Sequence, residues 1–178
     1  MATLVALLRG VNVGGKAKVP MPELRSLLSD VGFEDVVTYV QSGNVVFRTG
    51  GGAKQVAGQV ERTIADAFGL DVTVIVRTPA QLRTIAKSNP FLAEETDPQK
   101  LHVVFLSDRP SAAAAAALDP DRSPPDRFHL RGWELYLHLP NGSGRSKLTN
   151  DYLERRLGVR ATARNWRTLL KLIELTEA

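Results

Sequence analysis

Apolar residues recur along the chain with two different periods, and the alternation between these periods predicts the order of strands and helices. Glycine or proline stands at most of the boundaries, as expected where helices and strands begin and end. In the first half, the predicted strands are residues 3–9, 36–40, 45–48 and 72–76, and the predicted helices are residues 20–32, 54–68 and 79–87. Residues 88–90 read as a linker.

The same order of elements returns in the second half. Its predicted strands are residues 101–106, 127–130, 134–139 and 159–163, and its predicted helices are residues 112–117, 146–157 and 166–175. Ser111 and Ser146 are expected to cap the first two of these helices, because their hydroxyl groups accept hydrogen bonds from free backbone amides.

A short internal alignment supports a duplication. The segment FGLDVT at residues 68–73 aligns with LGVRAT at residues 157–162, and Arg77 then falls opposite Arg164. The similarity coincides with the same step in the order of elements. It therefore favours two modules of similar topology.

The element order predicts an α+β fold. The sequence β-α-β-β-α-β is the ferredoxin-like arrangement, so we expect two tandem ferredoxin-like modules, residues 1–90 and 91–178, each with an added C-terminal helix. The alternative is a single mixed sheet to which both halves contribute strands.

This topology predicts which loops lie together. A right-handed crossover makes the first and second strands of a module run in the same direction, so the loops that follow them share one edge of the sheet. In the first half this groups residues 9–18 with residues 41–44. The loops after the third and fourth strands share the opposite edge, which groups residues 141–147 with residues 164–166 in the second half.

The composition excludes several classes of protein. The chain has no cysteine, which rules out disulfide scaffolds, thiolate zinc sites and cysteine nucleophiles. With only three histidines, we expect no metal site and no cofactor. No apolar run is long enough to cross a bilayer, and the short apolar start has no basic residues before it. We therefore expect a cytoplasmic protein with no membrane partner.

Positive charge is concentrated near the C-terminus. The net charge is +4, and residues 145–171 hold eight basic and two acidic residues. Such a stripe attracts phosphate, nucleic acid or another anion. The alternative is a solvated helix face that only keeps the protein soluble.

Four segments resemble one family along essentially the whole chain. They are LLRGVNVGGKAKVPMPELRSLL, YVQSGNVVF, SKLTNDYLERRLGV and ATARNWRTLLKL, and they look like the bacterial domain-of-unknown-function family 1697. The resemblance implies a two-part α+β fold. It implies no activity, and no catalytic residue is carried over from it.

The first of these segments contains a glycine-rich loop that fits only part of a phosphate-binding motif. Residues 10–16 read G-V-N-V-G-G-K, but Ala17 stands where the motif needs Ser or Thr for magnesium. The following helix begins only near Pro20, so Lys16 is not at its N-terminus, and an ATPase is excluded. Glycine amides with Arg9, Lys16 and Lys18 could still hold an anion. Otherwise the glycines only permit a tight turn.

The loop clusters supply the candidate ligand-binding side chains. Amides would donate hydrogen bonds, a helix start near Ser146 would attract an anion, and Arg164 would bind phosphate. The candidates are Arg9, Asn12, Gly14, Gly15, Lys16, Gln41, Ser42 and Asn44 in the first half, and Arg145, Ser146, Lys147, Arg164 and Asn165 in the second. We interpret Trp166 as a core anchor; the alternative is that its ring stacks on a nucleic-acid base.

The predicted hairpin in the second half carries two of the histidines. With Gly132-Trp133 as a two-residue turn, one face of the hairpin is polar. That face holds Arg127, His129, Arg131, Glu134, Tyr136 and His138. A third metal ligand is missing, so we expect a solvated face or an open binding sheet. The acidic residues at 94–97 read as an ordinary surface loop.

Three functions follow as hypotheses. The first is a cytoplasmic protein that binds a phosphate-bearing ligand, with RNA or single-stranded DNA among the candidates. The second is an enzyme that acts on a small phosphorylated or anionic metabolite in a cleft between the modules. The third is a structural or dimerising module in which the motif residues serve folding.

Overall fold

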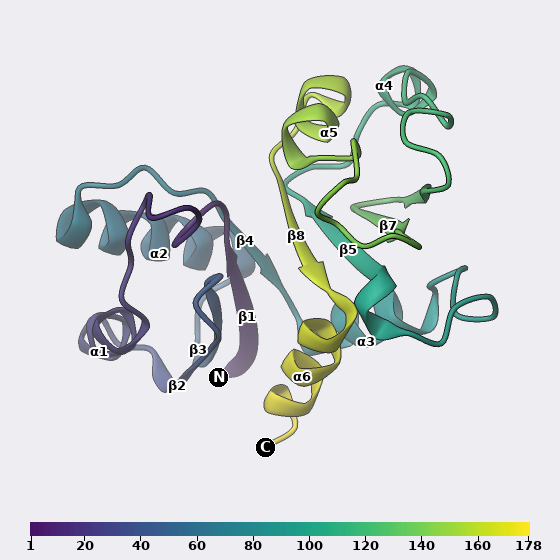
Figure 1. Cartoon of the computed structure of the whole chain (residues 1–178). Coiled ribbons are helices and arrows are strands. Elements are labelled where there is room, and N and C mark those ends of the chain that lie inside the picture. Colours follow the sequence, from purple (N-terminus) through teal and green to yellow (C-terminus); the bar gives the residue numbers. More distant parts are fainter. The chain divides into compact units, whose positions relative to one another are not determined.

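The computed structural model describes every residue from Met1 to Ala178 and divides the chain into two compact units (Figure 1). The first unit comprises residues 1–83 and 171–178, and the second comprises residues 84–170. Helices α3 (Pro79–Lys87) and α6 (Trp166–Thr176) each contribute residues to both units. The strands form two separate four-stranded sheets, so the alternative of a single mixed sheet is wrong.

The first unit contains a fully antiparallel sheet. Its strands are β1 (Ala2–Leu8), β2 (Glu34–Tyr39), β3 (Asn44–Thr49) and β4 (Val74–Arg77). Their order across the sheet is β2-β3-β1-β4, and each neighbouring pair is antiparallel. Because β1 and β2 both run antiparallel to β3, they share one direction, as the sequence predicts.

Two helices cover one face of this sheet (Figure 1). They are α1 (Met21–Asp30) and α2 (Ala53–Phe68). Val56, Val60 and Ile64 of α2 are four residues apart and therefore lie on one side of the helix, where they are fully buried. Gly69 ends α2 in the left-handed conformation, with φ of 67°.

The second unit repeats the strand order of the first. Its strands are β5 (Leu101–Leu106), β6 (Arg127–Arg131), β7 (Glu134–His138) and β8 (Ala161–Asn165), in the antiparallel order β6-β7-β5-β8. The helices are α4 (Ala112–Ala116), α5 (Asn150–Leu157) and a short 3-10 turn, η1 (Pro98–Lys100), which the sequence does not predict. Ser111 caps α4 as expected, since its hydroxyl accepts from the Ala114 amide.

Helix α5 begins four residues later than the sequence predicts. Its N-cap is Thr149, whose hydroxyl accepts a hydrogen bond from the Tyr152 amide at 3.2 Å. The Ser146 hydroxyl accepts from the Leu148 amide instead, within the preceding loop. The prediction that Ser146 caps this helix is therefore wrong, and an anion beside Ser146 would not meet the free amides of a helix start.

Strand β8 is also displaced from its predicted range. It pairs with β5 from Ala161 opposite Leu106 to Asn165 opposite His102. The segment V-R-A-T-A at residues 159–163 predicts a short strand, but the length and position of β5 decide which residues find hydrogen-bonding partners. The strand therefore extends two residues further toward the C-terminus.

The β6–β7 hairpin has the predicted register but not the predicted exposure. Arg131 pairs with Glu134 around the Gly132-Trp133 turn. However, Tyr136 is only 1% exposed, and its hydroxyl donates to the Ile85 carbonyl at 2.8 Å. Burial raises the pKa of Tyr136 to about 12, which keeps this donor protonated. The expectation of a solvated face or an open binding sheet is wrong for β7, because residues 85–95 cover Tyr136 and His138. On β6, Arg127, His129 and Arg131 are exposed as expected.

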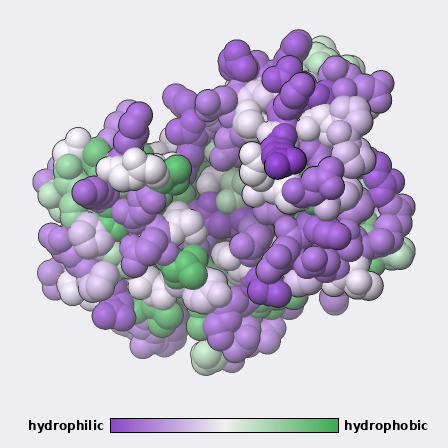
Figure 2. All heavy atoms as spheres, viewed as in Figure 1, coloured by the Kyte–Doolittle hydropathy of each residue, from purple (hydrophilic) through white to green (hydrophobic).

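The surface is largely polar. Figure 2 shows hydrophilic side chains over most of the visible surface of both units. No helix is both long enough and apolar enough to cross a membrane.

Candidate functional site

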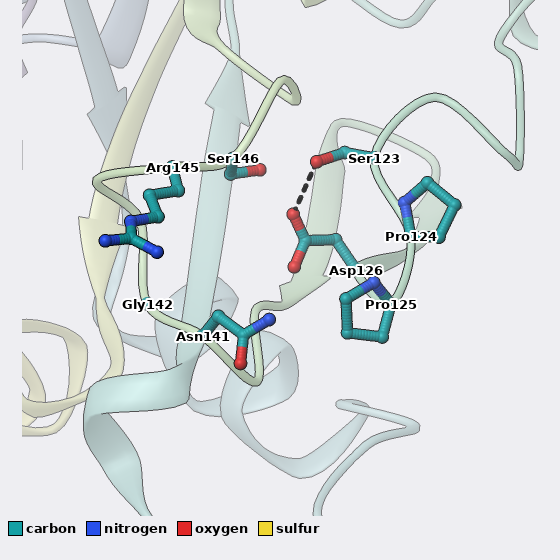
Figure 3. Close-up of a pocket in the computed structure, with 8 residues that line it drawn as sticks. All are labelled: Ser123, Pro124, Pro125, Asp126, Asn141, Gly142, Arg145 and Ser146. Carbon is teal, nitrogen blue, oxygen red and sulfur yellow. Dashed lines mark hydrogen bonds between the residues drawn. The ribbon is translucent and has the colours of Figure 1, made fainter.

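A pocket of about 390 Å³ opens in the second unit between two loops (Figure 3). The loop at residues 119–126 precedes β6, and the loop at residues 139–149 follows β7. These loops meet because Arg127 at the start of β6 pairs with His138 at the end of β7. The pocket is lined by Ser123, Pro124, Pro125, Asp126, Asn141, Gly142, Arg145 and Ser146.

Asp126 places a carboxylate on one wall of the pocket. The residue is only 7% exposed, and its Oδ2 atom accepts a hydrogen bond from the Ser123 hydroxyl at 2.8 Å. Figure 3 shows the carboxylate directed into the space between the two loops. No lysine or arginine forms an ion pair with Asp126. Its acceptor capacity is therefore only partly used by the protein.

Arg145 lies on the opposite wall from Asp126 (Figure 3). Its side chain is exposed and forms neither an ion pair nor a hydrogen bond with the protein. Asn141, which is also exposed, adds a side-chain amide between these two walls. The pocket thus combines a cation, a carboxylate, an amide and hydroxyl groups.

Hydrogen bonds join the two pocket loops directly. The Lys147 amide donates to the Ser123 hydroxyl at 3.0 Å, and Nε of Arg122 donates to the Lys147 carbonyl at 3.4 Å. Arg122 also lies over the Tyr152 ring, 4.4 Å from its centroid, and Arg156 lies 5.7 Å from the same centroid. Basic side chains therefore gather beside the pocket, together with the carboxylates of residues 119 and 121.

The predicted loop cluster in the first unit is present. The Leu8 amide donates to the Gly43 carbonyl at 2.9 Å, which places residues 9–18 beside residues 41–44. The Asn12 side chain joins them further. Its Nδ2 donates to the carbonyls of Gln41 at 2.6 Å and Val19 at 2.9 Å, and its Oδ1 accepts from the Val19 amide at 2.8 Å. The Asn12 amide group is thus engaged with the backbone.

The side chain of Asn44, like that of Asn12, forms hydrogen bonds within the protein. It is fully buried, and its Nδ2 donates to the Tyr39 carbonyl at 2.9 Å and the Ser42 hydroxyl at 3.1 Å. Both contacts shape the hairpin turn. They direct the amide of Asn44 toward its own turn.

The tip of the glycine-rich loop is exposed. Val13 and Lys16 form a β-bridge around Gly14 and Gly15, which both have positive φ. The Lys16 side chain forms no ion pair, whereas Arg9 has partners within the chain. The loop therefore presents two exposed lysines without an ion pair, Lys16 at the glycine turn and Lys18 after it.

The ends of β7 and β8 share one edge of the second sheet, as predicted, because His138 and Asn165 lie opposite Leu101 and His102 of β5. Arg164 and Asn165 nevertheless do not line the pocket. Arg164 is only 6% exposed, and its Nη1 donates to the Thr162 hydroxyl at 2.6 Å and the Ala163 carbonyl at 2.9 Å. Burial lowers its pKa to about 10, so it is still a cation at neutral pH. Asn165 Oδ1 accepts from the Thr168 amide at the start of α6. Trp166 is buried, which agrees with the prediction that it anchors the core.

Sequence reasoning missed Ser123 and Asp126 in the pocket. They flank Pro124 and Pro125, in the segment between the predicted helix at residues 112–117 and the predicted strand at residues 127–130. The signal that could have found them is the hairpin register, which places the residues before β6 beside those after β7.

The contact between Glu95 and His138 was also not predicted from the sequence. Their side chains are 15% and 10% exposed, respectively. No group of three or more histidine or acidic side chains is arranged to hold a metal ion.

Comparisons with known proteins agree with this architecture. The conserved bacterial protein SP0830 from Streptococcus pneumoniae has a structure similar to the whole chain, with a TM-score of 0.74, 21% identity and 98% coverage of each chain. At this identity the likeness shows a shared fold. None of the curated proteins matches the sequence. A family profile described as "Protein of unknown function (DUF1697)" matches residues 1–136, which confirms the resemblance found in the sequence. The chain belongs to the DUF1697 family.

Proposed function

We propose that the second unit binds a small phosphate-bearing ligand in its pocket, with Arg145 contacting the phosphate. One observation carries the proposal: an exposed arginine without an ion pair lines a pocket of about 390 Å³. This volume lies in the range of small-molecule sites. A guanidinium group presents parallel N–H donors that match the geometry of phosphate oxygens.

The pocket loops support the proposal because they are held in place by the protein. The bond from the Lys147 amide to Ser123 and the bond from Arg122 to the Lys147 carbonyl fix their separation. A site that is ordered before binding avoids part of the entropy cost of association. The Lys147 side chain, exposed and unpaired, adds to the positive potential near Arg145.

A small ligand is favoured over a polynucleotide. Single-stranded nucleic acid binds to proteins through a basic groove with exposed aromatic rings. Tyr136, the aromatic residue of the predicted binding sheet, is 1% exposed. Nucleic-acid binding is therefore an outcome to be tested, and the loop cluster of the first unit, with Lys16, is a second candidate anion site.

The remaining expectations are part of the same proposal. We propose that the two modules, residues 1–90 and 91–178 by element order, are ferredoxin-like. Their β-α-β-β-α-β order and the matching antiparallel strand orders support this assignment. We also propose a cytoplasmic location, which the absence of cysteine supports.

The proposal is tested by calorimetric titration of the full chain with inorganic phosphate, a nucleoside monophosphate and a short single-stranded RNA, at low and moderate salt. Arg145→Ala should weaken binding of the monophosphate by roughly tenfold or more, since charge-assisted hydrogen bonds are lost. Arg155→Ala is the matched control, because Arg155 is an exposed arginine of α5 outside the pocket.

Two results would overturn this function. One is the absence of binding of any phosphate-bearing probe at low salt. The other is an equal loss of affinity in the Arg145 and Arg155 variants, which would indicate a diffuse electrostatic effect. Binding of RNA alone, with a steep salt dependence, would replace the small ligand by a polynucleotide.

A further inference from the structure

We infer that the ligand of this pocket is a phosphorylated sugar, free or as part of a nucleotide, with Asp126 accepting hydrogen bonds from a sugar hydroxyl. The inference rests on the proposed function, because Arg145 is taken to bind the phosphate. It goes beyond that function by identifying the part of the ligand that carries the phosphate as a sugar.

The burial of Asp126 carries the inference. The residue Asp126 is only 7% exposed, and the carboxylates of such buried residues are normally satisfied by cations or several donors. Asp126 receives one side-chain hydrogen bond, from Ser123, and forms no ion pair. A carboxylate has about four acceptor positions. The positions that face the pocket in Figure 3 are available to donors on a ligand.

The charge around the pocket selects the kind of donor. Arg145 and Lys147 are exposed cations, and Arg122 and Arg156 lie together over Tyr152 next to the same loops. These four cations outnumber the carboxylates of Asp119, Asp121 and Asp126 in the same region, so the net positive charge disfavours an ammonium group and favours a ligand that carries negative charge. A hydroxyl group on an anionic molecule can donate to Asp126, while the molecule keeps the negative charge that the cations favour.

The remaining lining residues fit a sugar ring. Pro124 and Pro125 line the pocket and have no backbone N–H groups to donate. In Figure 3 the ring of Pro125 lies beside Asp126, where it offers an apolar surface to the carbon atoms of a sugar, whereas the ring of Pro124 points away from this space. Asp126 and Arg145 lie on opposite walls in Figure 3, so one molecule with a phosphate at one end and hydroxyl groups at the other can reach both.

The test compares three phosphate probes on the full chain: ribose 5-phosphate, propyl phosphate, which has no hydroxyl group, and adenosine monophosphate. We expect ribose 5-phosphate to bind about tenfold more tightly than propyl phosphate, as one hydrogen bond to a charged group predicts. Asp126→Asn keeps one acceptor oxygen but loses the charge, so it should reduce this preference and should not weaken the binding of propyl phosphate. Asp151→Asn, at an exposed carboxylate of α5, should change neither affinity.

The comparison of ligands on the wild-type chain needs no variant, so it remains decisive if Asp126→Asn does not fold. Equal affinities for all three probes would overturn the inference and leave the proposed function standing. Failure of all three probes to bind would overturn both. Tighter binding of ribose 5-phosphate than of propyl phosphate supports a free sugar phosphate as the ligand. Tighter binding of adenosine monophosphate alone supports a nucleotide.

Discussion

The Nε2 atom of His138 lies 3.0 Å from Oε1 of Glu95, and both side chains are almost buried. Nη2 of Arg127 lies 3.4 Å from Nδ1 of the same ring. Because an arginine can only donate, Nδ1 is the acceptor and Nε2 carries the proton that is directed at Glu95. The ring of Phe91 stacks on His138 at 5.6 Å. The contact thus fastens the segment before β5 to the end of β7.

The Glu95 contact makes the stability of the fold depend on pH. The hydrogen bond with His138 is the main cause that holds the pKa of Glu95 below its ordinary value of 4.5, and the bond from the Asp97 amide adds to it. A carboxyl group with a lower pKa in the folded chain stabilises the fold above its unfolded-state pKa. This stabilisation is lost as the pH falls through the folded-state pKa.

We therefore expect Glu95→Gln to be less stable than the wild type at pH 7, and the two proteins to converge in acid. Urea denaturation across this pH range measures the difference. Glu94→Gln is the control, because Glu94 pairs with Arg127 at an exposed position, where ion pairs contribute little. A difference that is constant from neutral to acidic pH would contradict the assignment to Glu95.

Asn12 should be important for stability because its amide joins three backbone groups. Asn12→Ala leaves the Val19 amide and the carbonyls of Val19 and Gln41 without this partner. We expect a loss of about 2 kcal/mol in the free energy of unfolding. Gln41→Ala retains the backbone carbonyl that Asn12 contacts, so we expect at most about 0.5 kcal/mol. Similar losses in both variants would show that Asn12 does not hold the loops together.

Position 43 requires glycine for two reasons: its backbone is left-handed, and neighbouring side chains leave no room for a Cβ atom. Its φ is +89°, and a Cβ atom would lie 2.7 Å from Cβ of Leu8 and 2.8 Å from Cγ2 of Val11. We expect Gly43→Ala to cost about 3 kcal/mol, because the buried neighbours must move. Gly14→Ala is the control, with φ of +58° and open space around it, and should cost about 1 kcal/mol. Equal thermal stabilities of the two variants would contradict the close packing at Gly43.

The start of α5 can be located by mutation. Thr149→Ala removes the cap of the Tyr152 amide and should cost about 1 kcal/mol. Ser146→Ala should cost less, because its bond to the Leu148 amide lies in a loop outside the helix. Chemical denaturation of the two variants provides the comparison. The reverse order would restore Ser146 as the helix cap.

Local patterns predicted most of the elements because the information lies within a few residues. Strand β5 and helix α3 have the predicted bounds, and Ser111 caps α4. The register of the β6–β7 hairpin follows from its two-residue turn. Even the proximity of residues 9–18 and 41–44 follows, because strand direction in this topology places both loops at one edge.

The candidate site was predictable only in part. Arg145 and Ser146 line the pocket, but Asp126 faces them from a proline-rich segment that carries no chemical motif. The polar alternation of β7 predicted solvent exposure for Tyr136 and His138. Alternation distinguishes the two faces of a strand, but it does not show what covers the polar face.

Sequence patterns are sufficient to predict the α+β class, the repeated order of elements, the hairpin register and the family, because each depends on local spacing or on several linked motifs. Three-dimensional packing places Asp126 across from Arg145, brings Glu95 to His138 and joins residues 171–178 to the first unit. These contacts connect segments far apart in the chain. They depend on how strands pair and how loops pack, and no local pattern contains that information.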